Sequence, residues 1–161
     1  MSQGKPAPSG ETQATEAGEA RESSKVVRFG DFNWEGVEAR SYKKVAPAAT
    51  WHGVDRHLLI GDSGEATPFQ LRYFEIEPGG YTSHEKHAHQ HAVVVLRGRG
   101  EVLLGERWQQ VGFGDVVYVA PNDPHQFRTV GDAPFGFLCV VDANRDRPRP
   151  PSGALELPGG S

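Results

Sequence analysis

The sequence has little of several features that define a function on their own. It holds a single cysteine, Cys139, among 161 residues. One cysteine forms no disulfide within the chain, which is typical of proteins from a reducing compartment and leads us to expect a cytoplasmic location. Cys139 lies in the apolar run FGFLCVV, where we expect a small buried apolar side chain rather than a nucleophile.

Further absences exclude whole classes of protein. No apolar run approaches the roughly 18 residues of a membrane-spanning helix, so we expect no contact with a membrane. The N-terminal segment lacks the apolar stretch of a secretory signal. Acidic and basic residues are interspersed at a formal net charge of −4. No basic patch with interleaved aromatic residues is present, so the expected partner is a small molecule and not nucleic acid.

A helical period is also missing after residue 50. In its place, short segments rich in β-branched and aromatic residues alternate with glycine, proline and aspartate. The predicted strands are residues 57–61, 69–77, 92–98, 101–105, 107–111, 115–120, 125–130 and 135–141. This pattern predicts an all-β sandwich or barrel. Residues 34–45 fit either a short helix or an irregular strand.

The composition divides the chain into four parts. Residues 1–25 are rich in Ser, Gly, Ala, Glu and Thr without an apolar face, so we expect a disordered tail. Residues 26–64 are interpreted as an extension that packs on the barrel, and residues 65–142 as the barrel itself. Residues 143–161 are rich in proline and glycine and are interpreted as a second tail.

Four of the seven histidines fall within eight positions, directly before an apolar strand. They are His84, His87, His89 and His91. In an extended backbone, alternation places Glu85 and His87 on one face. His91 shares a face with Val93, which leads into the apolar run and should point inward. A carboxylate and imidazoles that face a β-core are costly unless they are paired or bound to a metal.

Imidazole nitrogens together with a carboxylate oxygen suit a transition metal. His125, in the segment PNDPHQF, is a further donor at a turn-to-strand junction. The sequence therefore predicts one divalent ion (Fe, Mn, Zn, Ni or Cu) bound by Glu85, His87, His91 and His125. We expect His84 and His89 on a solvated loop, with His89 replacing His91 as a ligand if the strand register differs. His52 and His57 are expected to be structural or surface residues.

The first histidine segment resembles the first motif of the cupin superfamily. That motif reads Gly, five residues, His-x-His, three or four residues, Glu, six residues, Gly. Gly79, Glu85, His87, His91 and Gly98 keep its spacing. Glu85 stands where the family has its first histidine, and His91 stands where it has glutamate. The set of donors is retained in a permuted order.

The second cupin motif is matched less closely. It reads Gly, five residues, Pro-x-Gly, two residues, His, three residues, Asn. Gly114 and His125 keep the spacing, whereas Ala120, Asn122 and Thr129 replace proline, glycine and the final asparagine. Asparagine tolerates a left-handed turn nearly as well as glycine does.

The resemblance covers roughly half of the chain and implies a double-stranded β-helix of jelly-roll type with one metal. It also implies a homodimer, since cupins commonly pair through sheet edges. The family contains dioxygenases, decarboxylases, isomerases, storage proteins and sugar-binding regulators, so the fold alone does not select an activity.

We expect an oxygen-using enzyme that acts on a small organic molecule. The alternative is a non-catalytic binding or sensor protein with a structural metal. The residues expected to line the pocket are Val93, Val95, Phe127 and Phe137. Arg72 or Tyr73 would anchor a substrate carboxylate, although a solvated strand residue is an equally good interpretation of Arg72.

Overall fold

The structure is a computed structural model that describes residues 22–43 and 50–145. Most of the two tails expected from the sequence, namely residues 1–21 and 146–161, lies outside these ranges, as do residues 44–49. The strands of the described chain are β1 (Phe29–Gly30), β2 (Asn33–Trp34), β3 (Arg40–Ser41), β4 (His52–Ile60), β5 (Phe69–Tyr81), β6 (His91–Arg97), β7 (Arg99–Leu104), β8 (Arg107–Gly112), β9 (Val116–Val119), β10 (His125–Thr129) and β11 (Phe135–Asp142). Each predicted strand coincides with one of β4 to β11. In the described ranges there is no helix that could cross a membrane.

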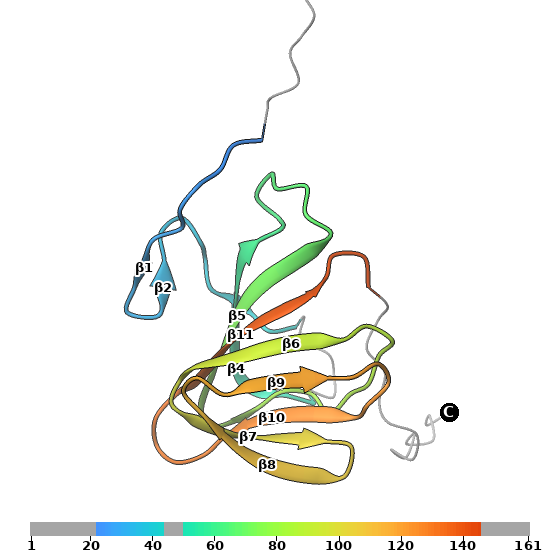
Figure 1. The fold of residues 1–161 in the computed structure, drawn as a ribbon. Coiled ribbons are helices and arrows are strands. Elements are labelled where there is room, and N and C mark those ends of the chain that lie inside the picture. Colours follow the sequence, from blue (N-terminus) through green and yellow to red (C-terminus); the bar gives the residue numbers. More distant parts are fainter. Residues whose placement is uncertain (1–21, 44–49, 146–161) are drawn as a thin grey trace, which may run out of the picture.

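Nine of the described strands form one antiparallel sheet that curls upon itself (Figure 1). Its central path runs β8-β7-β10-β5-β11-β6-β9, and β3 and β4 join it through β5. Strand β5, with 13 residues, pairs with β4 and β11 along most of its length and reaches β10 at Tyr81. This one strand therefore links the two layers of the barrel, and the expected all-β jelly-roll is confirmed.

Alternation of inward and outward side chains along β6 and most of β11 builds much of the core. In β6, Val93 and Val95 face inward and are buried, whereas Val94 between them is 40% exposed. Strand β11 alternates in the same way, with Phe137 and Cys139 inside. The buried apolar cluster comprises Val54, Phe74, Ile76, Val93, Val95, Val102, Val117, Val119, Phe127, Phe135, Phe137, Cys139 and Val141. Cys139 is thus buried, as expected.

The β1–β2 hairpin covers the outer face of β5. The ring of Trp34 packs on Tyr73 with centroids 4.8 Å apart, and His57 of β4 packs on both rings. His57 is buried and burial lowers its pKa, so its ring is neutral and structural. His52 is exposed. Residues 34–43 form short strands and turns, so the helical alternative for this region is wrong in its described part.

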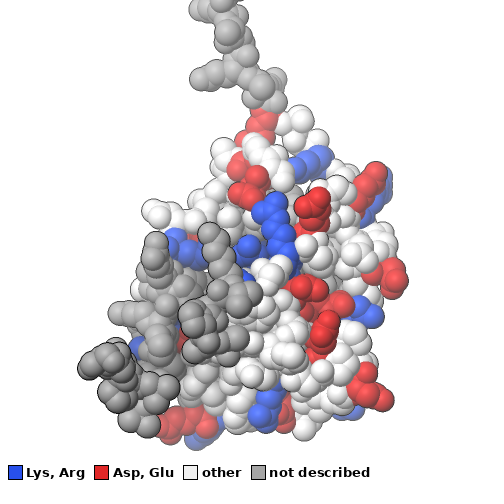
Figure 2. Space-filling view, turned by 180° about the vertical axis from the view of Figure 1, so that it is seen from behind, with Lys and Arg blue, Asp and Glu red and all other residues white. Residues whose placement is uncertain are grey.

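Charged residues of both signs are interspersed on the surface. Figure 2 shows lysine and arginine side chains next to aspartate and glutamate side chains over the face seen from behind. The charge pattern of this face matches the interspersed acidic and basic residues of the sequence.

Candidate functional site

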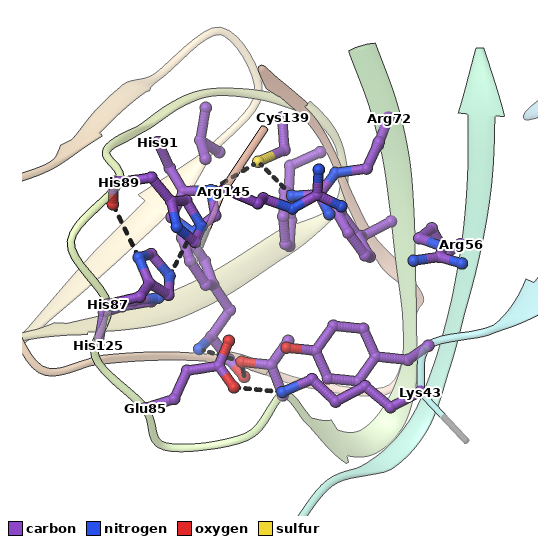
Figure 3. A pocket seen from close by; sticks show the side chains of 16 residues that line it. Lys43, Arg56, Arg72, Glu85, His87, His89, His91, His125, Cys139 and Arg145 are labelled. Atoms are coloured by element: carbon purple, nitrogen blue, oxygen red, sulfur yellow. Dashed lines mark hydrogen bonds and ion pairs between the residues drawn. The ribbon is translucent and has the colours of Figure 1, made fainter. Parts of the chain in front are cut away.

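A cavity of about 220 Å³ opens between the inner faces of β4, β5, β6, β10 and β11 (Figure 3). Its wall combines histidines, arginines and aromatic rings. The residues that line it are Tyr42, Lys43, Arg56, Arg72, Phe74, Thr82, Glu85, His87, His89, His91, Val93, His125, Phe127, Phe137, Cys139 and Arg145. Three of the four apolar residues expected at the pocket do line it, whereas Val95 lies deeper in the core.

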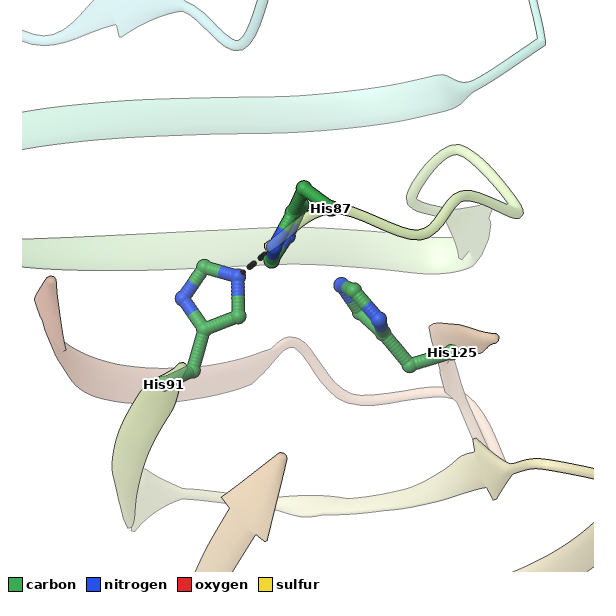
Figure 4. Close-up of side chains that lie close together, drawn as sticks. All are labelled: His87, His91 and His125. Atoms are coloured by element: carbon green, nitrogen blue, oxygen red, sulfur yellow. Dashed lines mark hydrogen bonds between the residues drawn. The ribbon is translucent and has the colours of Figure 1, made fainter. Parts of the chain in front are cut away.

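Three imidazoles converge in this cavity (Figure 4). One nitrogen from each of His87, His91 and His125 lies within 4.8 Å of the others. His91 begins β6 and His125 begins β10, whereas His87 comes from the turn before β6. The Nε2 atoms of His87 and His91 are 2.8 Å apart. Two neutral imidazole nitrogens remain at this distance when they share a proton or a cation.

Backbone hydrogen bonds hold the histidines in place. Glu85 and His125 form an isolated antiparallel bridge, with N–H to carbonyl distances of 3.1 and 2.9 Å, which joins the turn to β10. The amide of Asn122 donates to the carbonyl of His87 at 2.7 Å. Asn122 has a φ of 64°, so asparagine adopts the left-handed conformation expected where the motif has glycine.

Carbonyl oxygens also fix the tautomers of two rings. The Nδ1 atom of His87 lies 2.7 Å from the carbonyl of His89, and that of His125 lies 2.9 Å from the carbonyl of Asp123. Because a carbonyl only accepts, Nδ1 carries the proton in both rings. Each Nε2 then presents a lone pair, which is the form that binds a metal.

The environment keeps two of the imidazoles, those of His91 and His125, neutral. Burial, together with the neighbouring His125 and His87, lowers the pKa of His91 to about 2. Burial also lowers the pKa of His125, against the opposing effect of the Asp123 carbonyl. Neutral, convergent nitrogens match the donor set of a transition metal, so the three residues fit such an ion.

We expect the stability of the protein in the presence of a chelator to fall as the pH is lowered. The unfolded chain binds a proton on each histidine near pH 6.5, whereas the pKa values of His91 and His125 are lowered in the folded state. Below that pH the unfolded chain binds more protons, so acid favours unfolding by up to about 1.4 kcal/mol per pH unit for each histidine. Thermal melting from about pH 7.5 to about pH 5.5 measures the slope. His91→Gln should flatten the slope, and equal slopes for both proteins would contradict the assignment.

Glu85 lies in the same pocket, but its carboxylate forms an ion pair with Lys43. Lys43 also donates to the hydroxyl of Ser83 at 3.1 Å. The structure therefore brings three of the four predicted ligands together and places the fourth beside them with a cationic partner. A metal-binding role for Glu85 stays a prediction.

The two remaining histidines of the cluster differ from each other. His84 is exposed, as expected. His89 is buried, so the expectation of a solvated loop position is wrong for it. The turn folds back upon itself, and the ring of His89 stacks on that of His87 with centroids 3.5 Å apart. His91, and not His89, belongs to the group of converging nitrogens.

Arg72 faces the pocket and is only 8% exposed, so it is not a solvated strand residue. Tyr73 faces the opposite side of β5, where its hydroxyl donates to Glu75 at 2.8 Å. Arg56 and Arg145 also line the pocket, and neither was predicted from the sequence. A weak signal existed for Arg56, which is a single polar residue at an inward position of the segment HGVDRHLLI.

Cys139 connects the histidines to the arginines. Its sulfur lies 3.2 Å from Nδ1 of His91 and 3.6 Å from Nη2 of Arg72 (Figure 3). Burial raises the pKa of the thiol, so it is neutral near neutral pH. The apolar run FGFLCVV therefore contributes to the site as well as to the core.

Comparisons with known proteins agree with this architecture. The family model described as "Cupin domain" matches residues 72–141. The chain is 39% identical over 123 residues to 1-methylthio-D-xylulose 5-phosphate methylsulfurylase of Rhodospirillum rubrum, covering 76% of this chain and 77% of the relative. A cupin 2 conserved barrel domain protein from Rhodopseudomonas palustris superposes with a TM-score of 0.72 at 42% identity, over 81% of this chain and 88% of that one. A cupin-2 domain protein from Rhodospirillum rubrum gives a TM-score of 0.69 at 37% identity, over 81% and 85% of the two chains.

Proposed function

This chain belongs to the cupin superfamily, and we propose that its histidine pocket binds one divalent transition-metal ion that activates a small organic substrate. The convergence of three imidazole nitrogens carries the proposal. His87, His91 and His125 would hold the ion. When bound, it would supply a Lewis acid that polarises a substrate oxygen.

The remaining pocket residues favour a small, polar substrate. The cavity of about 220 Å³ has an aromatic side, formed by Phe74, Phe127 and Phe137, and a cationic side. The methylsulfurylase relative is named for a derivative of xylulose, a ketose in which a carbonyl and a hydroxyl are neighbours. We therefore propose a substrate with adjacent carbonyl and hydroxyl oxygens, because such a pair can reach one ion together.

Proton transfer in this pocket would depend on few groups. Burial and the nearby Glu85 raise the pKa of Tyr42, so its phenol can donate a hydrogen bond but not act as a base near neutral pH. The Glu85 carboxylate has Lys43 as its partner. If a substrate hydroxyl displaced Lys43, the carboxylate of Glu85 could accept the proton of that hydroxyl and later return it.

The test is reconstitution followed by turnover. Protein purified without chelators should contain about one transition-metal ion per chain by elemental analysis. The metal-loaded protein should then convert a hydroxycarbonyl compound from a panel of ketoses and ketose phosphates. Failure to bind metal would refute the proposal, and metal binding without turnover would favour the sensor alternative.

The same turnover experiment, run in an oxygen electrode, tests the oxygen use that we expected from the sequence. An oxygen electrode records whether turnover consumes oxygen. Uptake in proportion to product would favour a dioxygenase-like reaction. Turnover without uptake would assign the pocket to Lewis-acid chemistry.

We further propose that Glu85 serves as a fourth ligand, in exchange for its contact with Lys43. In the variant Glu85→His with His91→Glu, the donors return to the usual cupin order. If both side chains share one metal, this double variant should bind metal better than the two single variants predict, by about 1 kcal/mol or more. Competition with a chromophoric chelator measures the four affinities. If the losses of the two single variants simply added, Glu85 would pair with Lys43 and would not bind the metal.

A homodimer remains our expectation for the assembly. The outer face of β6 and the edge strand β9 is apolar, with Val116 72% exposed, Tyr118 63% exposed and Val94 40% exposed. An apolar face at a sheet edge is a surface that a second copy can cover. Light scattering at micromolar concentration should give a dimer, and Tyr118→Glu should shift it toward the monomer. A monomeric parent protein would contradict the expectation.

A further inference from the structure

Three arginines form one side of the pocket. Arg56 lies on β4, Arg72 on β5, and Arg145 three residues after the end of β11. In the β4–β5 register Arg56 pairs with Phe74 and Leu58 with Arg72, so Arg56 and Arg72 are diagonal neighbours. Figure 3 shows the three side chains on the side of the pocket away from His87. We call them the arginine wall.

The protein supplies only some of the hydrogen bonds that the three guanidinium groups can make, and no counter-charge from the described residues. Among the described residues, no carboxylate forms an ion pair with any of the three. The Nε atoms of Arg56 and Arg72 are buried without a hydrogen-bond partner. Nη1 of Arg145 donates to the backbone carbonyl of Asp142 at 3.1 Å, and Nη2 of Arg72 approaches the sulfur of Cys139. Each of these contacts leaves the positive charge uncompensated.

Such an arrangement opposes folding. Burial and the neighbouring Arg72 lower the pKa values of both Arg56 and Arg145. Asp62 has a smaller opposing effect on Arg56, and it lies 4.0 Å from Arg40. Arg72 is only 8% exposed and Arg56 and Arg145 are half-buried, so water screens the repulsion between Arg72 and its two neighbours less than it would on an open surface. One buried and two half-buried cations that share a pocket wall, with no carboxylate of the described residues paired to them, indicate a site for an anion that the protein does not supply.

The number and type of the cations define the anion. One carboxylate is bound by one bidentate guanidinium, so three arginines exceed its need. A phosphate monoester carries close to two charges near neutral pH and presents three terminal oxygens, which several planar guanidinium forks can share. We propose that Arg56, Arg72 and Arg145 bind the phosphate group of a phosphate-monoester substrate. This proposal rests on the proposed function, in which the reacting end of the substrate faces the three histidines.

The pocket accommodates a molecule with a phosphate group at one end and the reacting oxygens at the other. Cys139 contacts both His91 and Arg72, so one sulfur atom separates the histidine cluster from the arginine wall. The ring of Phe74 lies 5.0 Å below the guanidinium of Arg72 and restricts its orientation. Within about 220 Å³ the carbon chain between the phosphate and the reacting oxygens must be short, as it is in a pentulose phosphate.

Binding of D-xylulose 5-phosphate and of D-xylulose to the metal-loaded full-length protein tests the proposal by isothermal titration calorimetry. The phosphate ester should bind at least 100-fold more tightly than the free sugar. Arg56→Met and Arg72→Met should each weaken binding of the ester by roughly 10- to 100-fold and leave that of the free sugar unchanged. Arg107→Met, on the exposed strand β8 and outside the pocket, is the matched control and should bind like the parent.

The outcomes separate this proposal from the proposed function. Metal content and melting temperature of each variant establish that it is folded. If the parent binds the ester and the free sugar equally, or if the arginine variants keep the preference while folded, the arginine wall is not a phosphate site. Those results would not contradict the proposed metal binding by the histidines. If the parent protein bound no metal but still preferred the ester over the free sugar, only the proposed function would be overturned. Titration with inorganic phosphate should show competition with the ester, and its absence would count against the site.

Discussion

Replacing His125 with alanine should lower the affinity for a divalent transition metal by more than about 100-fold. Loss of an outer-shell partner of a metal ligand already costs roughly 10- to 100-fold, and His125 is one of three converging donors. The backbone of His125 is bonded to Glu85 and its Nδ1 lies against the carbonyl of Asp123, so its Nε2 is held in the orientation of a ligand. Competition with a chromophoric chelator gives the affinity of each variant.

The same histidine-rich segment offers two matched controls. His84 is exposed and lies outside the pocket, so His84→Ala should leave the affinity unchanged. His89 lines the pocket and stacks on His87, but lies outside the group of converging nitrogens. His89→Ala should weaken binding about tenfold or less, through the lost support of His87. If His89→Ala had the larger effect and His91→Ala the smaller one, His89 would be the ligand.

The strands of the barrel could be predicted because each has a local signal. Segments such as residues 92–98 and 135–141 alternate between inward and outward positions and end at glycine or proline turns. His91 follows from the same alternation, since it precedes Val93 on the inner face. The spacing of the two motifs adds His87 and His125. These are features of short range, and a single sequence displays them.

The ion pair of Glu85 with Lys43 had no such signal. The two residues lie 42 positions apart, and Lys43 belongs to neither motif. Alternation placed Glu85 on the face of His87, but it does not determine which cation reaches a carboxylate. The burial of His89 was missed for a related reason. The stacking of the His89 ring on His87 depends on tertiary packing. The polar sequence around His89 indicated a solvated loop instead.

The arginine wall shows where alternation fails. On β5, apolar and polar residues do not separate between the two faces, because the β1–β2 hairpin covers the outer face of Tyr73. Both faces are therefore buried, and the choice between Arg72 and Tyr73 stayed open in the sequence. Arg56 and Arg145 come from the segments before and after the two motifs. The sheet topology brings them to Arg72, and local sequence patterns carry no information on that proximity.

Replacing Gly98 with alanine should destabilise the protein by about 3 kcal/mol or more. Gly98 ends the first motif and has a φ of 64°, a conformation that costs alanine roughly 1 kcal/mol relative to glycine. A Cβ atom at this position would also lie 2.1 Å from the carbonyl oxygen of Pro134. That neighbour is backbone, so the β6–β7 turn and the segment before β11 would have to separate. The melting temperature should fall by roughly 6 °C or more.

Gly105 distinguishes the two contributions to this cost. It has nearly the same φ, 62°, but a Cβ atom there would meet nothing within 4 Å. Gly105→Ala should therefore show the conformational cost alone, about 1 kcal/mol. Urea denaturation of both variants and the parent measures the difference. Equal losses would mean that Pro134 moves away readily. A much larger loss for Gly98→Ala would show that glycine is needed here because two turns meet, one after β6, which carries His91, and one before β11, which carries Cys139.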